Sequence, residues 1–377
     1  MSCLGALAAA LLLVGGQEPV DPVVRVRVLE RLHPREAMLS GPADLPLSAG
    51  QGRLLASGQV AEQPLLLPDG AWRIALPGRT SRSYRGSLSV RSVEGELRFV
   101  LALPLERYVA QVVAAESLPG TPEQALRALA VVVRSFVLAQ GRRHDDAEVC
   151  DLSHCQLFRG TGVSPELLAS ARAAASATRG QVLVLSSGRV AEALFHAACG
   201  GHTADPAEVL GSSGTGAAAV ADPGCPVEPW EAELPLGMAR SALAPLLGPR
   251  LLLDADPLGL QVIPGTGGYA LVVVERATGR AASGDAVARA LDRALGWGRV
   301  RSGRFRLEPL GARVRVHGSG LGHGLGLCQA GAARLAARGE SHRAILAHYF
   351  PLAVLTDAAA LTGLRRQEPE RLPTAGR

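Results

Sequence analysis

The sequence predicts an α+β fold in which a small strand-rich region precedes a mixed domain with buried helices. Residues 22–100 alternate apolar and polar side chains and break often at turns, which is typical of strands. From residue 104 the apolar residues recur with helical spacing. A chain of 377 residues with 47% hydrophobic composition can bury a sizeable core, and its length suggests two or three folding units.

The N-terminal residues predict a signal peptide at 1–16. Their apolar stretch, Leu4 to Val14, is too short to span a bilayer but has the length of a signal-peptide core. Small residues precede the expected cleavage after Gly16, although no Arg or Lys precedes the apolar stretch. An uncleaved anchor is the alternative. We expect export to the periplasm or another extracytoplasmic cell-wall space, with membrane contact only through this segment.

The net charge of +5 comes from arginine, because the chain has no lysine. This mild basicity suits an anionic polymer. No basic run with interleaved aromatic residues occurs, so we predict no nucleic-acid binding.

Two helices are expected after the strand-rich region. LERYVAQVVAAE, residues 105–116, has apolar residues at helical spacing. The second helix starts in TPEQ, residues 121–124, where Thr is the N-cap, Pro takes the first position and Gln completes a capping box. It runs to about Gln140 with Gly141 as its C-cap, and its all-round apolar sequence predicts burial.

The rest of the chain reads as mixed helices and strands, with no internal repeat. The expected elements are a helix near 165–178, strands at 181–187 and 190–198, a loop at 205–225, a helix at 241–247, strands at 251–256, 260–265 and 269–276, a helix at 284–295, a strand at 304–310 and closing helices at 328–339 and 341–351. The last residues, 365–377, are expected to be disordered.

A glycine-rich stretch, HGSGLGHGLGLCQAGA at 317–332, has glycine at every second position from Gly318 to Gly326. No glycine triplet fits a dinucleotide loop and no P-loop Lys-Ser/Thr follows, so a phosphate cradle is excluded. Period two predicts an extended strand with one bare face, against which a flat ligand can lie. The alternative is that the glycines permit close packing against the helix at 122–140.

Glu116 ends the first helix, where the helix dipole and apolar neighbours favour a protonated carboxyl suited to general-acid chemistry. Local sequence alone favours a surface glutamate that ends a helix. The polar loop that follows the second helix holds His144, Cys150, His154 and Cys155. These residues suit tetrahedral zinc, and a Cys150–Cys155 disulfide is an equal alternative.

The segment FHAACGGHTADP, residues 195–206, ends an expected strand in a glycine pair flanked by His196 and His202. Paired glycines mark a tight turn or a close backbone approach. Cys199 can pair with Cys225 in a disulfide, and Cys328 is read as a buried thiol rather than a nucleophile.

Seven of these signatures, in this order, resemble the SpoIID/LytB family, the stage II sporulation protein D and amidase-enhancer domain. The signatures are YRGSLSV, LPLERYVAQVVAAE, PEQALRALAVVVRSF, VCDLSHCQLFRG, TRGQVL, FHAACGGHT and SGLGHGLGLCQAGA, with ILAHYFP closing the match. The resemblance implies a SpoIID-like mixed domain with a largely antiparallel sheet and buried helices. The expected organisation is a signal peptide at 1–16, a strand-rich region at 22–82, a catalytic domain at 83–352 with an inserted α/β part at 230–315, and a tail at 365–377.

The resemblance also implies a function, a peptidoglycan lytic transglycosylase. It would cleave the MurNAc–GlcNAc bond of peptide-denuded glycan strands and leave 1,6-anhydroMurNAc ends, with Glu116 as the single acid/base. One structural zinc ion would be held by His144, Cys150, His154 and Cys155. The expected substrate-binding residues are Arg134, His196, Gly200, Gly201, Thr203, Ser319, Gly322, His323, Gly324 and Gln329.

The alternative from another class is a non-catalytic glycan-binding module that enhances an N-acetylmuramoyl-L-alanine amidase. Retention of Glu116 favours the enzyme. Ala197 and Ala198 favour the module, because they stand where the family commonly carries hydroxyl groups. Expected partners are glycan strands and an amidase or other cell-wall proteins.

Overall fold

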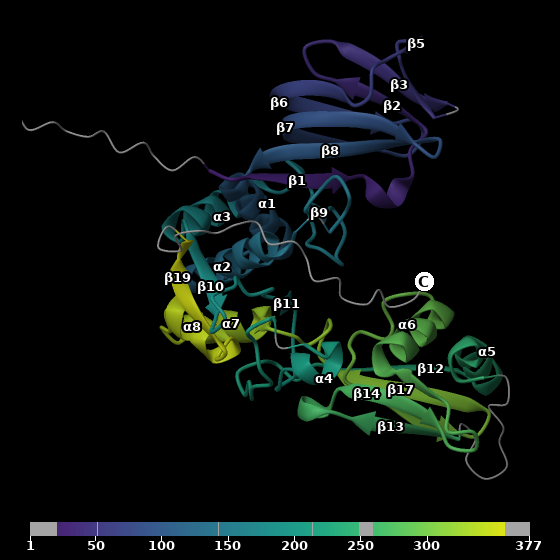
Figure 1. Cartoon of the computed structure of the whole chain (residues 1–377). Helices are drawn as coiled ribbons and strands as arrows, with labels where there is room; N and C mark the ends of the chain where they lie inside the picture. The colour runs from purple at the N-terminus through teal and green to yellow at the C-terminus, as the bar shows by residue number, and fades with distance from the viewer. Residues whose placement is uncertain (1–20, 51, 142, 213, 249–258, 359–377) are drawn as a thin grey trace, which may run out of the picture.

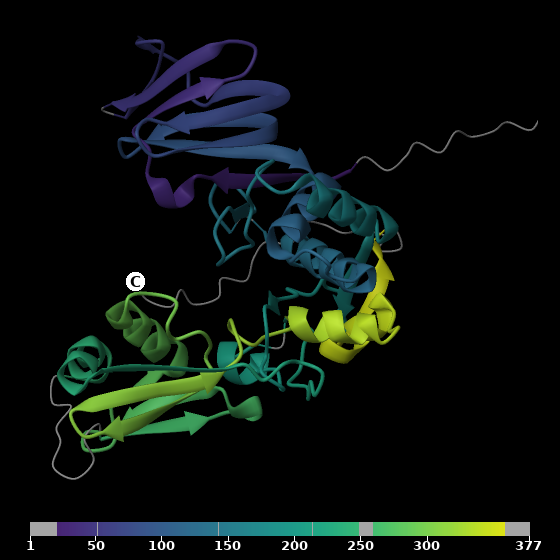
Figure 2. The same cartoon turned by 180° about the vertical axis from the view of Figure 1, so that it is seen from behind.

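The computed structural model describes residues 21–358 apart from 51, 142, 213 and 249–258, and it has an α+β fold. Figures 1 and 2 show an N-terminal sheet at one end, a group of helices in the middle and a second sheet-containing part at the other end. The expected signal peptide, the strand at 251–256 and the tail at 365–377 lie outside the described residues.

The strand-rich region forms a nine-stranded sheet with the order β5-β4-β3-β2-β6-β7-β8-β1-β9. Its strands are β1 Val23–Val28, β2 Glu36–Ser40, β3 Asp44–Gly50, β4 Arg53–Ala56, β5 Gln59–Val60, β6 Leu65–Leu76, β7 Thr80–Val93, β8 Glu96–Pro104 and β9 Val149–Cys150, with a 3-10 turn, η1, at Glu30–Leu32. All pairs are antiparallel except β1 with β9. The expected domain boundary at residue 83 falls inside β7, which pairs along its length with its neighbours, so residues 23–104 form one sheet with β9.

The first two predicted helices are present as α1 Leu105–Glu116 and α2 Glu123–Ala139. The expected capping box is wrong in detail. Pro122 is the N-cap of α2, and the Thr121 hydroxyl donates to the Leu118 carbonyl at 2.7 Å. The Gln124 side chain instead accepts the His342 backbone N–H at 2.9 Å. Tertiary packing against the C-terminal helices therefore replaces the local cap.

Helix α2 is the centre of the main core, as its apolar sequence predicts, with every residue from Ala125 to Val137 buried except Arg127. It packs against α1 and α3, Pro165–Ala177, and against the closing helices α7, Gln329–Ala337, and α8, His342–Tyr349. A short antiparallel pair, β10 Gln181–Leu185 with β19 Ala353–Asp357, lies beside it.

Arg134 lies inside this core and is 0% exposed. Its guanidinium donates to both oxygens of the Glu106 carboxylate at 2.7 and 2.6 Å, and to the carbonyls of Gln181 and Ala175. The side chain cannot reach a bound glycan, so the expected substrate contact is corrected to a structural one that joins α1, α2, α3 and β10.

The segment after β10 is less regular than expected. Only Phe195–His196 of the predicted strand at 190–198 is a strand, β11, and it pairs in parallel with β18, Leu327–Cys328. The expected loop at 205–225 contains a short helix, α4, Pro206–Leu210. Both connections between the core and the inserted part pass through this region.

Residues 229–319 form the inserted part and have a hydrophobic core of their own, which includes Trp230, Leu243, Val273 and Leu291. Two three-stranded antiparallel sheets and two helices surround that core. The elements are β12 Pro229–Pro235, α5 Leu236–Leu247, β13 Leu260–Pro264, η2 Thr266–Gly268, β14 Ala270–Glu275, β15 Ala281–Ser283, α6 Gly284–Leu295, β16 Phe305–Leu310 and β17 Arg313–Ser319. The part expected as an α/β insert at 230–315 therefore combines helices with antiparallel sheets.

Within the described residues, none of the helices combines the length and the apolar character needed to cross a membrane.

The buried ion pair between Arg134 and Glu106 leads to a prediction about stability. Arg134→Met should lower the free energy of unfolding by about 3 to 5 kcal/mol, because it leaves the Glu106 carboxylate without its partner. Adding Glu106→Gln should recover part of this loss. Arg127→Met, which removes an exposed pair with Glu123 on the same helix, is the control and should cost about 0.5 kcal/mol or less. Urea unfolding checks all three, and equal losses for Arg134→Met and Arg127→Met would contradict the structural assignment.

Candidate functional site

Glu116 is the last residue of α1, and its carboxylate is partly buried. Its Oε1 accepts a hydrogen bond from the backbone N–H of Leu157 at 2.9 Å. Burial raises the pKa of the Glu116 carboxyl, while the Leu157 N–H and the charge of Arg159 oppose the increase. The carboxyl therefore holds its proton to a higher pH than an ordinary glutamate, which suits a group that donates a proton.

His144, Cys150, His154 and Cys155 come together as the sequence predicts, and we call this group the loop cluster. Their ligand atoms all lie within 4.8 Å of one another. The His144 Nε2 is 3.2 Å from the Cys155 Sγ, and the Cys150 Sγ is 3.3 Å from the His154 Nε2. Both cysteines are free thiols, so the alternative Cys150–Cys155 disulfide is not formed. Two imidazoles and two thiols are a donor set that can hold a metal ion.

The loop cluster is fixed to the N-terminal sheet. Its strand β9 pairs with β1, and the Glu148 carboxylate receives the Arg25 guanidinium at 2.6 Å. The Asp151 carboxylate accepts the Leu29 backbone N–H at 2.8 Å. Two residues past Cys155 the same loop supplies the Leu157 N–H to Glu116. One continuous segment thus connects the sheet, the loop cluster and the candidate acid.

The same loop also contacts the N-terminal half of α1. The buried Tyr108 hydroxyl donates to the Gln156 Oε1 at 3.0 Å, and the Tyr108 ring stacks on Phe158 with centroids 5.6 Å apart. These contacts lie on either side of Leu157. They leave little freedom for the backbone N–H that faces Glu116.

The glycine stretch is not the extended strand that period two predicts. Strand β17 ends at Ser319, and Gly320, Gly322, Gly324 and Gly326 all have positive φ, from 71° to 99°. Left-handed glycines that alternate with other residues have the same spacing as one face of a strand. The stretch is held by backbone hydrogen bonds between Leu321 and Ala198, in both directions.

The glycines face protein rather than a groove, which corrects the expected roles of Gly322 and Gly324 in sugar binding. A Cβ on Gly322 would lie 3.2 Å from the His196 Cβ, and one on Gly324 would enter the Tyr269 ring. A Cβ on Gly326 would overlap the Leu194 carbonyl. The alternative prediction, that the glycines permit close packing, is confirmed in part. They pack against the segment around His196 and against the insert, and not against helix α2.

Two predicted histidines meet at this stretch, His196 beside it and His323 within it, with ring centroids 5.7 Å apart. His196 is 4% exposed, its Nδ1 bonds the Leu325 carbonyl at 3.0 Å, and burial lowers its pKa to about 3. It is therefore neutral and structural, not a substrate contact. His323 is exposed, and its Nδ1 accepts the Leu325 N–H at 3.0 Å.

Some of the other predicted substrate-binding residues are buried and some are accessible. Thr203 is fully buried, and its hydroxyl accepts the Val220 N–H at 2.8 Å, so its role is structural. Gly200 and Gly201 have positive φ of 70° and 107° and form the predicted tight turn. Ser319 and Gln329 are partly exposed. Of the predicted side chains, His323, Ser319 and Gln329 remain accessible to a ligand.

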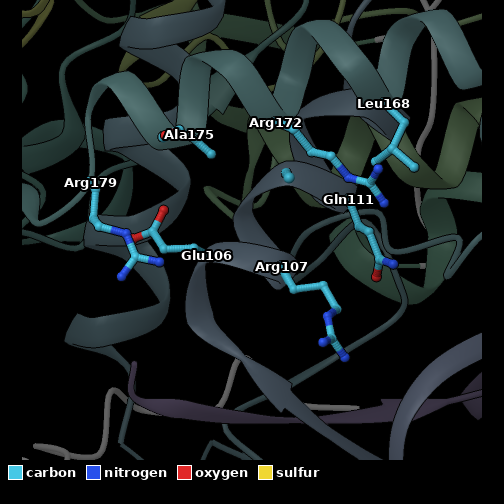
Figure 3. Close-up of a pocket in the computed structure, with 9 residues that line it drawn as sticks. Glu106, Arg107, Gln111, Leu168, Arg172, Ala175 and Arg179 are labelled. Atoms are coloured by element: carbon cyan, nitrogen blue, oxygen red, sulfur yellow. The ribbon is translucent and has the colours of Figure 1, made fainter. Parts of the chain in front are cut away.

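A cavity of about 250 Å³ lies between α1 and α3, away from Glu116, and the sequence did not predict it. Figure 3 shows Arg107, Arg172 and Arg179 around it, with Glu106 and Gln111. Its charge is partly compensated, because Arg107 lies 3.5 Å from an Asp69 oxygen and Arg179 lies 3.8 Å from an Asp21 oxygen. It borders the Glu106–Arg134 ion pair.

Comparisons with known proteins find a family match over part of the chain. Residues 93–185 match the family model of SpoIID, the Stage II sporulation protein. This range contains α1, α2, the loop cluster, α3 and β10. The chain is also similar to an uncharacterized protein of Brachyspira hyodysenteriae, with 25% identity over 269 residues, which cover 71% of this chain and 70% of the relative.

The packing of the glycine stretch can be tested with a matched pair of variants. Gly324→Ala should destabilise the protein by about 1 to 3 kcal/mol more than Gly298→Ala. Both residues have positive φ, 80° and 74°, but only Gly324 lies against a side chain, while nothing lies within 4 Å of a Cβ on Gly298. Thermal melting checks this. Equal losses for the two variants would mean that φ strain alone matters and that the contact with Tyr269 does not.

Proposed function

Residues 93–185 belong to the SpoIID family, and on this premise we propose that the protein is an exported lytic transglycosylase of peptidoglycan. It cleaves the MurNAc–GlcNAc bond of peptide-denuded glycan strands and forms 1,6-anhydroMurNAc ends. The observation that supports this proposal best is the environment of Glu116, which lies inside the matched range.

Glu116 has the properties that a single acid/base requires. Its pKa is raised by burial, so it can hold a proton for the leaving group. The Leu157 N–H bonds Oε1 and leaves Oε2 without a hydrogen bond to the described residues, so Oε2 is the oxygen that can hold the reactive proton. Apart from burial, the groups among the described residues that act on the pKa of Glu116 are the Leu157 N–H and Arg159. A second carboxylate is not among them, so the site is unlike the carboxylate pair of a hydrolase.

A lytic reaction needs only one such group. A glycoside hydrolase usually needs two carboxyl groups, because one must activate a water molecule or attack the sugar. In the lytic reaction the C6 hydroxyl of MurNAc is the nucleophile. Glu116 protonates the glycosidic oxygen as the C1–O bond breaks, and then takes the proton of the C6 hydroxyl as the 1,6-anhydro bond forms. The proton count of Glu116 is restored at the end of each cycle.

We assign glycan contacts to the predicted side chains that remain accessible, His323, Ser319 and Gln329. His323 uses its Nδ1 to accept the Leu325 N–H, so its Nε2 carries the proton of the neutral ring. The Phe195 backbone already interacts with this ring, so a sugar oxygen would have to take its place as the acceptor of that proton.

The loop cluster is assigned to one structural zinc ion. His144, Cys150, His154 and Cys155 supply four protein ligands, which leave no open position for water, so the ion would supply rigidity rather than chemistry. The four residues of the loop cluster hold the loop whose Leu157 N–H bonds Glu116.

Location and partners follow from the same proposal. A glycan-strand substrate lies outside the cytoplasm, which agrees with the signal peptide expected at 1–16. The partners are then glycan strands, and an amidase or other cell-wall proteins that act on the same polymer. We expect no nucleic-acid partner.

The first test concerns Glu116. Glu116→Gln keeps an oxygen that can accept the Leu157 N–H but loses the titrating proton, so cleavage of denuded glycan strands should fall by about 10²- to 10⁴-fold. Mass spectrometry of the anhydro products measures the rate. Glu123→Gln, an exposed glutamate on the next helix, is the matched control and should cleave like the wild type. A folded Glu116→Gln protein with full activity would rule out the assigned role.

The pH dependence provides an independent test of the same residue. The wild-type rate should fall as the pH rises through the raised pKa of Glu116, because the protonated acid is lost.

The folding stability of the wild type should also depend on pH through Glu116. Burial of the charged form is a cost that is absent below the pKa of an ordinary glutamate and complete above the raised pKa. Glu116→Gln should therefore melt at or above the wild-type temperature at pH 7, and the difference should vanish in acid. A Gln variant less stable than wild type at pH 7 would contradict the pKa direction.

The zinc assignment predicts a change in metal content. The double variant Cys150→Ser/Cys155→Ser should hold one zinc equivalent fewer than the wild type and should melt earlier, because folding and metal binding are coupled. His33→Ala, at an exposed histidine outside the loop cluster, should keep the wild-type zinc content. Unchanged zinc in the double variant would exclude these ligands.

A further inference from the structure

A second group of buried ligand atoms lies outside the loop cluster, and we call it the root cluster. It consists of Cys199, Asp222, Cys225 and Cys328, whose Sγ and carboxylate atoms all lie within 4.8 Å of one another. The Cys225 Sγ is 3.6 Å from the Cys328 Sγ, and the Cys199 Sγ is 3.3 Å from the Asp222 Oδ2. All four residues are at least 96% buried.

Ordinary packing does not explain why these groups meet. Asp222 is 2% exposed, and neither of the two groups that hydrogen-bond its carboxylate is a cation. Its hydrogen bonds come from the Tyr349 hydroxyl at 2.8 Å and from the Cys199 thiol. A buried carboxylate without a compensating cation is costly. A bound cation would remove this cost.

A disulfide does not account for the root cluster either. The three cysteines are free thiols in the structure, and three thiols cannot all be paired within the group. Any single disulfide would leave one buried thiol beside the carboxylate. The expected Cys199–Cys225 disulfide is therefore not the arrangement found.

The surrounding backbone is already arranged to stabilise sulfur as a metal-binding thiolate. Cys328 is the N-cap of α7, and its Sγ accepts the backbone N–H groups of Gly331 and Cys199, each at 3.3 Å. Hydrogen bonds from outside the ligand set orient metal ligands and adjust their basicity. A Cβ on Gly331 would overlap the Asp222 carboxylate, so the first turn of α7 lies directly on the cluster.

We propose that Cys199, Asp222, Cys225 and Cys328 bind a second structural metal ion, and that this ion is zinc. Thiolate and carboxylate oxygen are both zinc ligands, and four protein ligands make a closed, structural site. A tetrahedral ion with bonds of about 2.3 Å to sulfur and 2.1 Å to oxygen separates its ligand atoms by about 3.6 to 3.8 Å. The separations found here, 3.6 and 3.3 Å, need little adjustment to reach these values.

The position of the root cluster gives the ion its function. Asp222 and Cys225 lie just before β12, where the inserted part begins, and Cys328 follows the glycine stretch that leaves the insert after β17. Cys199 lies on the segment that pairs with that stretch through Ala198 and Leu321. The ion would tie both connections of residues 229–319 to each other and to helix α7 of the core.

Zinc content measured on the full, untagged protein tests this proposal. Inductively coupled plasma mass spectrometry should find two zinc ions per chain in the wild type. Cys150→Ser/Cys155→Ser should keep one ion, held by the root cluster. Cys225→Ser/Cys328→Ser should also keep one, held by the loop cluster, and it should melt earlier than the wild type. Because the root cluster is intact in the first two proteins, the test stands even if the last variant fails to fold.

Three results would overturn the proposal. One is a wild-type protein with a single zinc ion that Cys150→Ser/Cys155→Ser removes completely. Another is a disulfide between any two of Cys199, Cys225 and Cys328, found by peptide mapping of protein purified without reductant. The third is iron instead of zinc at the root cluster. None of these outcomes depends on glycan cleavage, so the proposed activity and this site can fail separately.

Discussion

The hydrogen bond from the Leu157 N–H to the Glu116 carboxylate is the contact on which the proposed chemistry depends. It joins the C-terminal end of α1 to the loop at 144–158, and that loop is held to the N-terminal sheet by β9 and to α1 by Tyr108. If the loop moved, Glu116 would lose both the donor and the neighbouring groups that bury it. The sheet, the loop cluster and the helix thus act together to place one carboxyl group and to set its proton affinity.

The sequence predicted elements that local chemistry determines and failed where distant contacts decide. Helix α1 follows from apolar spacing and helix α3 was expected near 165–178, and the structure has both at nearly the expected residues. The predicted capping box of α2 is wrong because the Gln124 side chain accepts a hydrogen bond from His342, 218 residues away. The glycine stretch was wrong because period two fits both an extended strand and alternating left-handed residues, and only its neighbours, His196 and Tyr269, distinguish them.

The candidate site shows the same division. The four residues of the loop cluster lie within twelve positions of one another, so their spacing revealed them. The root cluster spans residues 199–328 and is assembled by the parallel pairing of β11 with β18, which single cysteines in separate motifs cannot reveal. Arg134 and Thr203 belong to conspicuous motifs, but their side chains complete buried hydrogen bonds, and only burial separates such residues from ligand contacts.

We propose that a single glutamate cleaves glycan strands without using water. Cleavage of denuded strands in water enriched in oxygen-18 distinguishes this reaction from hydrolysis, because the mass of each new end reports the nucleophile. We expect 1,6-anhydroMurNAc ends that lack one water and carry no oxygen-18. Reducing ends that contain oxygen-18 would show hydrolysis and contradict it.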